Sequence, residues 1–280
     1  MIKTIKKLWV EKACEAYTVS SDIPLDILPD ADSVSFLILG DTGSGTVNQK
    51  QVAASSEQTA LDRGCDFVLF AGDNFIQTGI TSLNDPQLDE KFESMYHLDR
   101  PFYAILGNHD LRGNWKAQID YSLINPRWHL PAPNYHFNAG PVFIQAVNTS
   151  CSMQTLWQLY QKSPQPWHLA MGHHPAISSG RHGGMLWPER MVVGRSDIDF
   201  FVSGHNHALE HARYRKFDQI VSGGGGSSIE STKRPRLKQT LFYEECHGYI
   251  WAHMTRDTAT FLYFNANGQE IYRFSRNKTK

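Results

Sequence analysis

The sequence lacks the long apolar segments that characterise membrane-spanning and exported proteins. No run approaches the about 18 uncharged apolar residues that a transmembrane helix needs. Residues 1–17 are basic and then apolar, but Glu11, Lys12 and Glu15 interrupt the stretch that a signal peptide requires. We therefore expect a cytoplasmic location, and export by another route stays open.

Paired cysteines and an excess of charge are also missing. The chain has four cysteines, which are far apart and form no Cys-x-x-Cys pair: Cys14, Cys65, Cys151 and Cys246. This argues against a thiolate zinc site, and unpaired thiols are the simplest interpretation, although disulfide pairings stay open. The formal net charge of -1 provides no attraction to nucleic acid or an anionic membrane, so neither is a predicted partner. A small anionic substrate would need a local attraction, such as metal ions.

Five short apolar runs each end in a glycine followed by a polar residue. The runs cover residues 34–39, 67–71, 102–106, 169–171 and 200–203, and the pairs that follow them are Gly40-Asp41, Gly72-Asp73, Gly107-Asn108, Gly172-His173 and Gly204-His205. Continuous apolar runs of this length, flanked by glycine, are typical of strands buried on both faces. Apolar residues at helical spacing predict helices over residues 48–63, before Gly64, and over residues 86–97.

The C-terminal part has a different pattern. Residues 248–254, 258–265 and 270–275 alternate apolar and polar side chains between turns, which predicts an antiparallel meander. Residues 136–149 predict a hairpin of the same kind. We therefore expect an α/β fold with a large antiparallel component, arranged as two facing sheets. Residues 1–30 are expected to form a helical or irregular N-terminal extension, and residues 31–280 a single domain.

Polar side chains at the ends of these strands form a candidate metal site, because functional groups gather beyond the carboxyl ends of strands in open α/β sheets. They are Asp41, Asp73, Asn108, His173, His205 and His207. Carboxylate, amide and imidazole ligands together suit Fe, Mn or Zn. Six ligands are too many for one catalytic ion with an open position, whereas two ions bridged by a carboxylate use them all. A single Gly-Asp pair is usually only a turn, so the prediction depends on all five motifs occurring together.

With these motifs the chain resembles the calcineurin-like metallophosphoesterases, and most of all the small tartrate-resistant purple acid phosphatases. The matching blocks are Gly40-Asp41-Thr42-Gly43, Gly72-Asp73-Asn74, Gly107-Asn108-His109-Asp110, Gly172-His173-His174-Pro175 and Gly204-His205-Asn206-His207. The resemblance covers roughly residues 35–275. It implies an α/β/β/α sandwich of two mixed β-sheets flanked by helices, and two divalent or mixed-valence ions (Fe, Mn or Zn) as cofactors.

The resemblance also implies a role for each site residue. Asp41 and His207 would bind one metal, Asp73 would bridge, and three residues would bind the second metal: Asn108, His173 and His205. His109 would contact the substrate phosphate and protonate the leaving group, and His182 would be a second substrate-facing histidine. Asp110 is expected to orient His109, in the manner usual for histidines at metal sites.

One position departs from the purple acid phosphatase pattern. Where that family continues its second block with an iron-binding tyrosine, this chain has Ile76, which has no ligand atom. The first metal therefore has three recognisable ligands, and Gln77 or Asn48 are candidates to complete it. Without a phenolate we expect a weaker preference for Fe(III) and no purple colour.

Three functions are compatible with this site. The first is hydrolysis of phosphate monoesters by a metal-bound hydroxide, with His109 as the general acid. The second is hydrolysis of phosphodiesters or nucleotides at the same site. The third is a degenerate metal-binding protein without activity. A small phosphorylated substrate is the expected partner, and the oligomeric state stays open.

Overall fold

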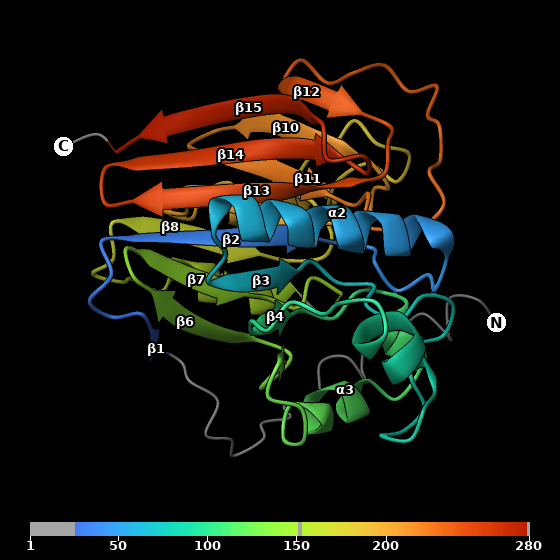
Figure 1. The fold of residues 1–280 in the computed structure, drawn as a ribbon. Coiled ribbons are helices and arrows are strands. Elements are labelled where there is room, and N and C mark those ends of the chain that lie inside the picture. Colours follow the sequence, from blue (N-terminus) through green and yellow to red (C-terminus); the bar gives the residue numbers. More distant parts are fainter. Residues whose placement is uncertain (1–25, 151–152, 279–280) are drawn as a thin grey trace.

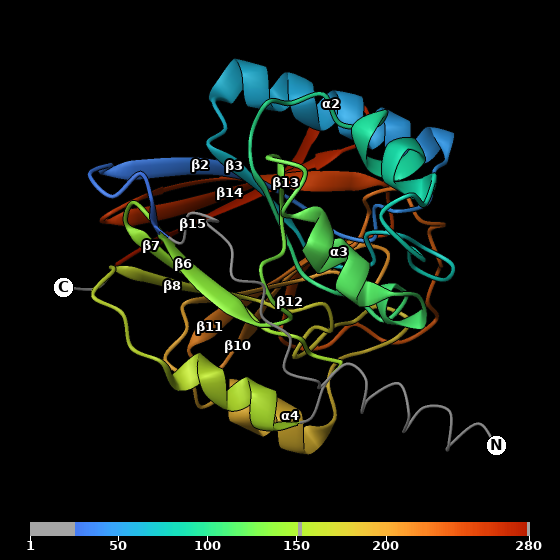
Figure 2. The same ribbon diagram turned by 90° about the horizontal axis from the view of Figure 1, so that it is seen from below.

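The computed structural model describes residues 26–150 and 153–278, which form two facing mixed β-sheets with helices on their outer faces (Figures 1 and 2). The eight-stranded sheet has the order β1 (Asp26–Ile27), β6 (Tyr135–Ala139), β7 (Val142–Ala146), β8 (Trp167–Met171), β9 (Phe200–Ser203), β11 (Phe217–Ser222), β10 (Leu209–Tyr214) and β12 (Thr240–Glu244). The seven-stranded sheet has the order β15 (Glu270–Asn277), β14 (Thr258–Asn265), β13 (Gly248–Thr255), β2 (Ser33–Leu39), β3 (Phe67–Phe70), β4 (Phe102–Ala104) and β5 (Trp128–His129). This arrangement confirms the predicted fold class.

The helical segments are α2 (Val47–Arg63), η1 (Asp89–Glu93), η2 (Asp110–Arg112), α3 (Trp115–Tyr121), η3 (Met153–Tyr160) and α4 (Trp187–Val193). Figure 2 shows α2 beyond the seven-stranded sheet and α4 on the opposite side of the molecule, beyond the eight-stranded sheet. The Thr46 side chain caps the start of α2 by accepting a hydrogen bond from the main-chain N–H of Gln49, and Gly64 follows the helix with a φ of 85°. No helix of the described segments is long and apolar enough to cross a membrane.

The predicted strands of the apolar runs lie in the middle of the two sheets. Strands β2, β3 and β4 pair in parallel, and so do β7, β8, β9 and β11. Parallel neighbours end at the same edge of a sheet, so the polar residues after β2, β3 and β4 are brought together, as are those after β8 and β9. The predicted meander is also present, because β14 pairs antiparallel with both β13 and β15.

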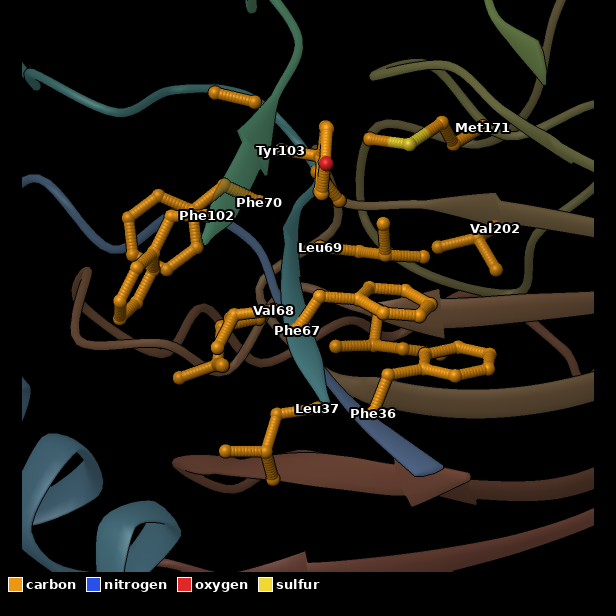
Figure 3. Close-up of a cluster of buried hydrophobic side chains, with 14 of the residues drawn as sticks. Phe36, Leu37, Phe67, Val68, Leu69, Phe70, Phe102, Tyr103, Met171 and Val202 are labelled. Atoms are coloured by element: carbon orange, nitrogen blue, oxygen red, sulfur yellow. The ribbon is translucent and has the colours of Figure 1, made fainter. Parts of the chain in front are cut away.

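The core lies between the sheets and on the helix side of the seven-stranded sheet. Along β3, Phe67 and Leu69 point toward Met171 of the second sheet, whereas Phe70 points to the opposite face (Figure 3). This alternation follows from the two-residue period of a strand. All four residues of β3 are buried, which explains its uninterrupted apolar sequence. The centre of the fold therefore holds the site-bearing strand ends in a rigid setting.

Two expectations from the sequence were wrong in detail. The helix expected over residues 86–97 is present but shorter and partly of another type: residues 87–88 are α-helical and Asp89–Glu93 form the π-helix η1, in which the main-chain N–H of Ser94 donates to the carbonyl of Asp89 at 2.9 Å. Phe92 and Tyr96, four residues apart, both pack against Phe70 in an aromatic cluster, as expected for residues on one face of a helical turn.

The second correction concerns the end of the expected N-terminal extension. Asp26–Ile27 is neither helical nor irregular, because it pairs in parallel with β6 as the edge strand β1. Residues 1–25 lie outside the described part of the chain. Cys65 and Cys246 are unpaired thiols, as predicted, whereas Cys14 and Cys151 also lie outside the described residues.

Candidate metal centre

Asp41 and Asp73 directly follow β2 and β3, and both side chains are buried. Their backbones are left-handed, with φ values of 56° and 54°, which non-glycine residues rarely adopt and which often mark functional sites. A Cβ atom at Gly72 would lie only 2.7 Å from Nδ1 of His173. Glycine before Asp73 therefore allows the end of the second sheet to approach the carboxylates closely.

The predicted ligands converge at this point. Ligand atoms of Asp41, Asp73 and His173 all lie within 4.8 Å of one another. The Nε2 atom of His173 is 3.3 Å from Oδ2 of Asp73, and Nε2 of His207 is 3.4 Å from Oδ1 of Asp41. The His205 ring centroid is 5.1 Å from that of His173. Side chains from four separate strand ends thus surround one small space.

Two of the imidazoles have a defined orientation. Nδ1 of His173 is 2.9 Å from the carbonyl oxygen of Ala71, and Nδ1 of His207 is 2.7 Å from the carbonyl oxygen of Ser228. A carbonyl only accepts hydrogen bonds, so each Nδ1 carries the hydrogen and donates it. The free Nε2 atoms then face the carboxylates, which is the arrangement usual for histidines that bind metal.

Three buried polar atoms at the site fit a metal ion. Oδ1 of Asp41, Oδ1 of Asn108 and Nε2 of His173 have no hydrogen-bond partner among the described residues. Buried polar atoms normally have partners, and leaving one unsatisfied costs about 1–3 kcal/mol. These three atoms are of the types that bind Fe, Mn or Zn, so the donor set fits the pair of ions that the resemblance implies.

The carboxylates also raise the pKa values of their neighbouring histidines. Burial disfavours the imidazolium form of His173, but the charge of Asp73 outweighs burial and raises the pKa of His173 to about 10. Burial is likewise outweighed at His207, where Asp41 raises the pKa to about 9. Burial would raise the pKa of Asp73, yet the His173 imidazole holds it below its ordinary value. The site therefore has the negative potential that favours cations.

The metal centre opens into a cleft of about 1160 Å³. Both predicted substrate-facing histidines, His109 and His182, line this cleft. Nε2 of His109 is 3.9 Å from Oδ2 of Asp73, and the His182 ring centroid is 4.8 Å from that of His205. The structure thus brings both histidines to the metal centre although 72 residues separate them in the sequence, and their chemical roles stay predictions.

The loop that carries His182 is held by residues that sequence reasoning missed. Oδ1 of Asn206 accepts a hydrogen bond from the main-chain N–H of His182 at 2.8 Å, and Nδ2 of Asn206 donates to the carbonyl of Gly183. Glu230 lines the cleft with one oxygen 3.4 Å from Nε2 of His182 and the other 2.9 Å from Arg181. Asn206 lies inside a quoted motif, but Glu230 has no motif that would have indicated it.

The glycine run 223–226 also contributes to the site, although its sequence resembles a flexible linker. All four glycines are buried. A Cβ atom at Gly225 would lie 2.3 Å from the carbonyl oxygen of Gly40, which precedes Asp41. Directly after the run, the hydroxyl of Ser227 donates to the carbonyl of Asp41 at 2.7 Å. Glycine is required here because main chain packs directly against the segment that carries the predicted ligand Asp41.

Asp110 has a different role from the expected one. Its carboxylate does not contact the His109 ring; it accepts hydrogen bonds from three main-chain N–H groups, those of Asn74, Phe75 and Gly107. Nδ1 of His109 lies 3.2 Å from the carbonyl oxygen of Gln77 instead. Asp110 therefore joins the loop after β3 to the loop after β4, and so fixes the segments of two predicted ligands, Asp73 and Asn108, relative to each other.

The two residues after Phe75 line the cleft. Ile76 and Gln77 both contribute to its wall, whereas Asn48, the other candidate ligand, does not. The backbone of Ile76 is fixed, because its N–H donates to the carbonyl of Gly43 at 2.8 Å and its carbonyl accepts from Lys91 at 2.9 Å. An isoleucine side chain thus occupies a firmly held position on the cleft wall.

Comparison with known proteins identifies the family to which this chain belongs. Residues 34–209, more than half of the chain, match the calcineurin-like phosphoesterase family. The chain belongs to this family and is a hydrolase of phosphate esters, in a family that depends on metal ions, typically two.

Particular relatives confirm the closer resemblance that the motifs indicated. Purple acid phosphatase 3 of Arabidopsis thaliana is 27% identical, over 87% of this chain and 78% of the relative. Tartrate-resistant acid phosphatase type 5 of Homo sapiens is 26% identical, over 86% and 90%. The solved structure of GAP50, the anchor in the inner membrane complex of Plasmodium, has a TM-score of 0.79 at 22% identity and covers 89% of this chain and 90% of that one. The last similarity shows a shared fold.

The position of Asp110 leads to a test of how the site is held together. Asp110→Ala would leave three main-chain N–H groups without their acceptor, at roughly 1–3 kcal/mol for each one that stays buried. We expect the free energy of unfolding in urea to fall by roughly 3 kcal/mol or more, and the metal content to fall with it. The exposed Asp62 on α2 provides the control, since Asp62→Ala should change neither quantity. Wild-type stability in Asp110→Ala would contradict the assigned role.

Proposed function

We propose that this chain hydrolyses phosphate monoesters with two metal ions held by the six predicted ligands. Asp41 and His207 would hold the first ion, Asp73 would bridge, and the second ion would be held by Asn108, His173 and His205. The observation that carries the proposal is a set of three buried atoms without a hydrogen-bond partner among the described residues: Oδ1 of Asp41, Oδ1 of Asn108 and Nε2 of His173. Two of them also lie within 3.4 Å of another predicted ligand. Monoesters are favoured because the curated relatives are named acid phosphatases.

The bound ions would neutralise the phosphate charge and supply the nucleophile by lowering the pKa of water. The protein residues would fix the geometry of the reaction. Main-chain N–H groups of His109 and His205 donate to Asp73 and Asp41, respectively, at 2.8 Å each, and these bonds orient the carboxylates. Orientation of this kind removes a large part of the entropic barrier to reaction.

His109 is the proposed general acid. With Nδ1 donating to the carbonyl of Gln77, the ring presents Nε2 as the atom that transfers a proton to the departing alkoxide. His182 lines the same cleft and is the second proposed contact for the phosphate. No covalent intermediate is involved, because the site motifs provide no nucleophilic serine, cysteine or aspartate.

Two alternative functions of this site can be distinguished from hydrolysis of monoesters by experiment. A phosphodiesterase or nucleotide hydrolase would use the same ligands, so only a panel of monoester and diester substrates separates it from the proposed activity. A degenerate metal-binding protein without activity is the second alternative, and the fold is also that of GAP50, which is described as an anchor. Elemental analysis addresses this alternative, because a decayed site would hold well below two ions per chain.

The central test combines metal removal with substitution of the bridging ligand. We expect the purified chain to hold two ions, to lose turnover of an aryl phosphate on chelation, and to regain it with Mn, Zn or Fe. Asp73→Ala should lower kcat/KM by more than about 100-fold, because the loss of mere supporting residues at metal sites already costs about 10–100-fold. Asp62→Ala is the matched control. Near wild-type turnover in Asp73→Ala with its metal content measured would refute the proposed mechanism.

A second test concerns the general acid. His109→Ala should reduce hydrolysis of an alkyl phosphate by about 10²-fold or more, the usual contribution of a positioned acid, and should affect a nitrophenyl ester much less. The reason is that a good leaving group departs without protonation. His97→Ala, which removes a histidine whose side chain is 73% exposed and far from the motifs, should leave both rates unchanged. Equal losses on both esters would argue against general acid catalysis by His109.

A third test asks whether Ile76 explains the expected lack of colour. Loaded with Fe(III), the wild-type chain should show no intense visible band, because it has no phenolate at this position. Ile76→Tyr should gain such a band, since Ile76 lines the cleft on a fixed backbone. Ile76→Phe, which adds the ring without the phenol oxygen, should not. An intense band in the wild-type chain would mean that another tyrosine binds the ion.

A further inference from the structure

His174 is an imidazole at the metal centre that the proposed mechanism does not use. It follows His173 directly, lines the cleft and is partly exposed there. Its ring centroid lies 4.3 Å from that of His205 and 5.2 Å from that of His173. The His174 ring is therefore beside two proposed ligands of the second metal ion, on the wall of the space into which a substrate must enter.

Thr149 holds this ring through two contacts. Its hydroxyl oxygen accepts a hydrogen bond from the main-chain N–H of His174 at 2.9 Å, and lies 3.0 Å from Nδ1 of the same residue. A hydroxyl that accepts one bond still has its own hydrogen to donate. Donation to Nδ1 leaves the hydrogen of a neutral imidazole on Nε2.

The threonine is itself confined by packing. A Cβ atom at Gly172 would lie 2.4 Å from Cγ2 of Thr149, so the methyl group packs closely against the end of β8. A threonine has few χ1 rotamers to choose from, and this contact fixes the direction of the hydroxyl. The Thr149–His174 pair is thus held in one arrangement by the two Thr149 contacts and by the packing of the Thr149 methyl group.

We propose that His174 binds the phosphate of the substrate by donating a hydrogen bond from Nε2, and that Thr149 is the positioning residue that sets this tautomer. The inference depends on the proposed function for its substrate, and inorganic phosphate is the simplest ligand with the same chemistry. Hydrogen bonds to charged acceptors are stronger than neutral ones. His174 would act on bound ester and on bound product alike, so its loss should weaken binding more than it slows the chemical step.

The test measures phosphate binding separately from turnover. His174→Phe keeps an aromatic ring and loses both nitrogens, and Thr149→Val keeps the shape and loses the hydroxyl. In the metal-loaded protein, calorimetry with inorganic phosphate should show a Kd raised roughly tenfold or more in each variant. KM for an aryl phosphate should rise by a similar factor, with a smaller change in kcat, and elemental analysis should still find two ions per chain.

Thr149→Ser is the matched control: it keeps the hydroxyl but loses the methyl group that fixes its direction, so it should bind phosphate more tightly than Thr149→Val and at most as tightly as the wild type. The double variant His174→Phe/Thr149→Val should be no weaker than His174→Phe alone, since Thr149 acts through the histidine. Unchanged phosphate affinity in both single variants would overturn the inference. Loss of an ion in His174→Phe would also overturn it, by making His174 a metal ligand.

A failure of the proposed function and a failure of the role of His174 would give different combinations of ester hydrolysis and phosphate binding. If no ester were hydrolysed but phosphate binding still fell in His174→Phe and Thr149→Val, the phosphate site would stand and the monoesterase activity would not. If esters were hydrolysed with wild-type KM in both variants, the enzyme activity would stand and the role of His174 would be refuted.

Discussion

Two buried carboxylates at the end of one sheet impose requirements on much of the surrounding structure. Asp41 and Asp73 are 0% and 2% exposed, and an unpaired buried charge costs about several kcal/mol even after relaxation. Main-chain N–H groups of His205 and His109 donate to them, and neighbouring imidazoles add positive charge. These partners come from both sheets. The two sheets must therefore end at one point, and cations at that point complete the charge compensation.

This requirement explains features that would otherwise be unfavourable. Left-handed backbones at Asp41 and Asp73 cost conformational energy, and the surrounding contacts hold them in place. Asp110 connects the loops after β3 and β4 through three main-chain hydrogen bonds, and Gly225 lets a further loop pack against Gly40. The supporting residues thus position the carboxylates, while the strands supply the rigid frame.

The sequence predicted the parts of this arrangement that depend on local pattern. Uninterrupted apolar runs revealed the central strands, and a glycine before Asp73 or His173 marked where each strand ends. Contacts between distant segments left no local signal. Glu230 meets His182 across 48 residues, and Thr149 meets His174 across 25. The glycine run 223–226 could not be interpreted from the sequence, because glycine is favoured both in flexible linkers and where main chain packs closely in the interior.

The exchange of a tyrosine for Ile76 affects both the ions and the cleft. The proposed first ion would lack a negative oxygen at this position, which would weaken selection for Fe(III) and favour a divalent pair. The same exchange adds an apolar side chain to a cleft wall that also includes Leu111 and Met185. Apolar walls exclude water and strengthen the electrostatic interactions inside a closed site. Ile76 thus places an apolar side chain on the cleft wall where the resemblance implies a ligand of the first ion.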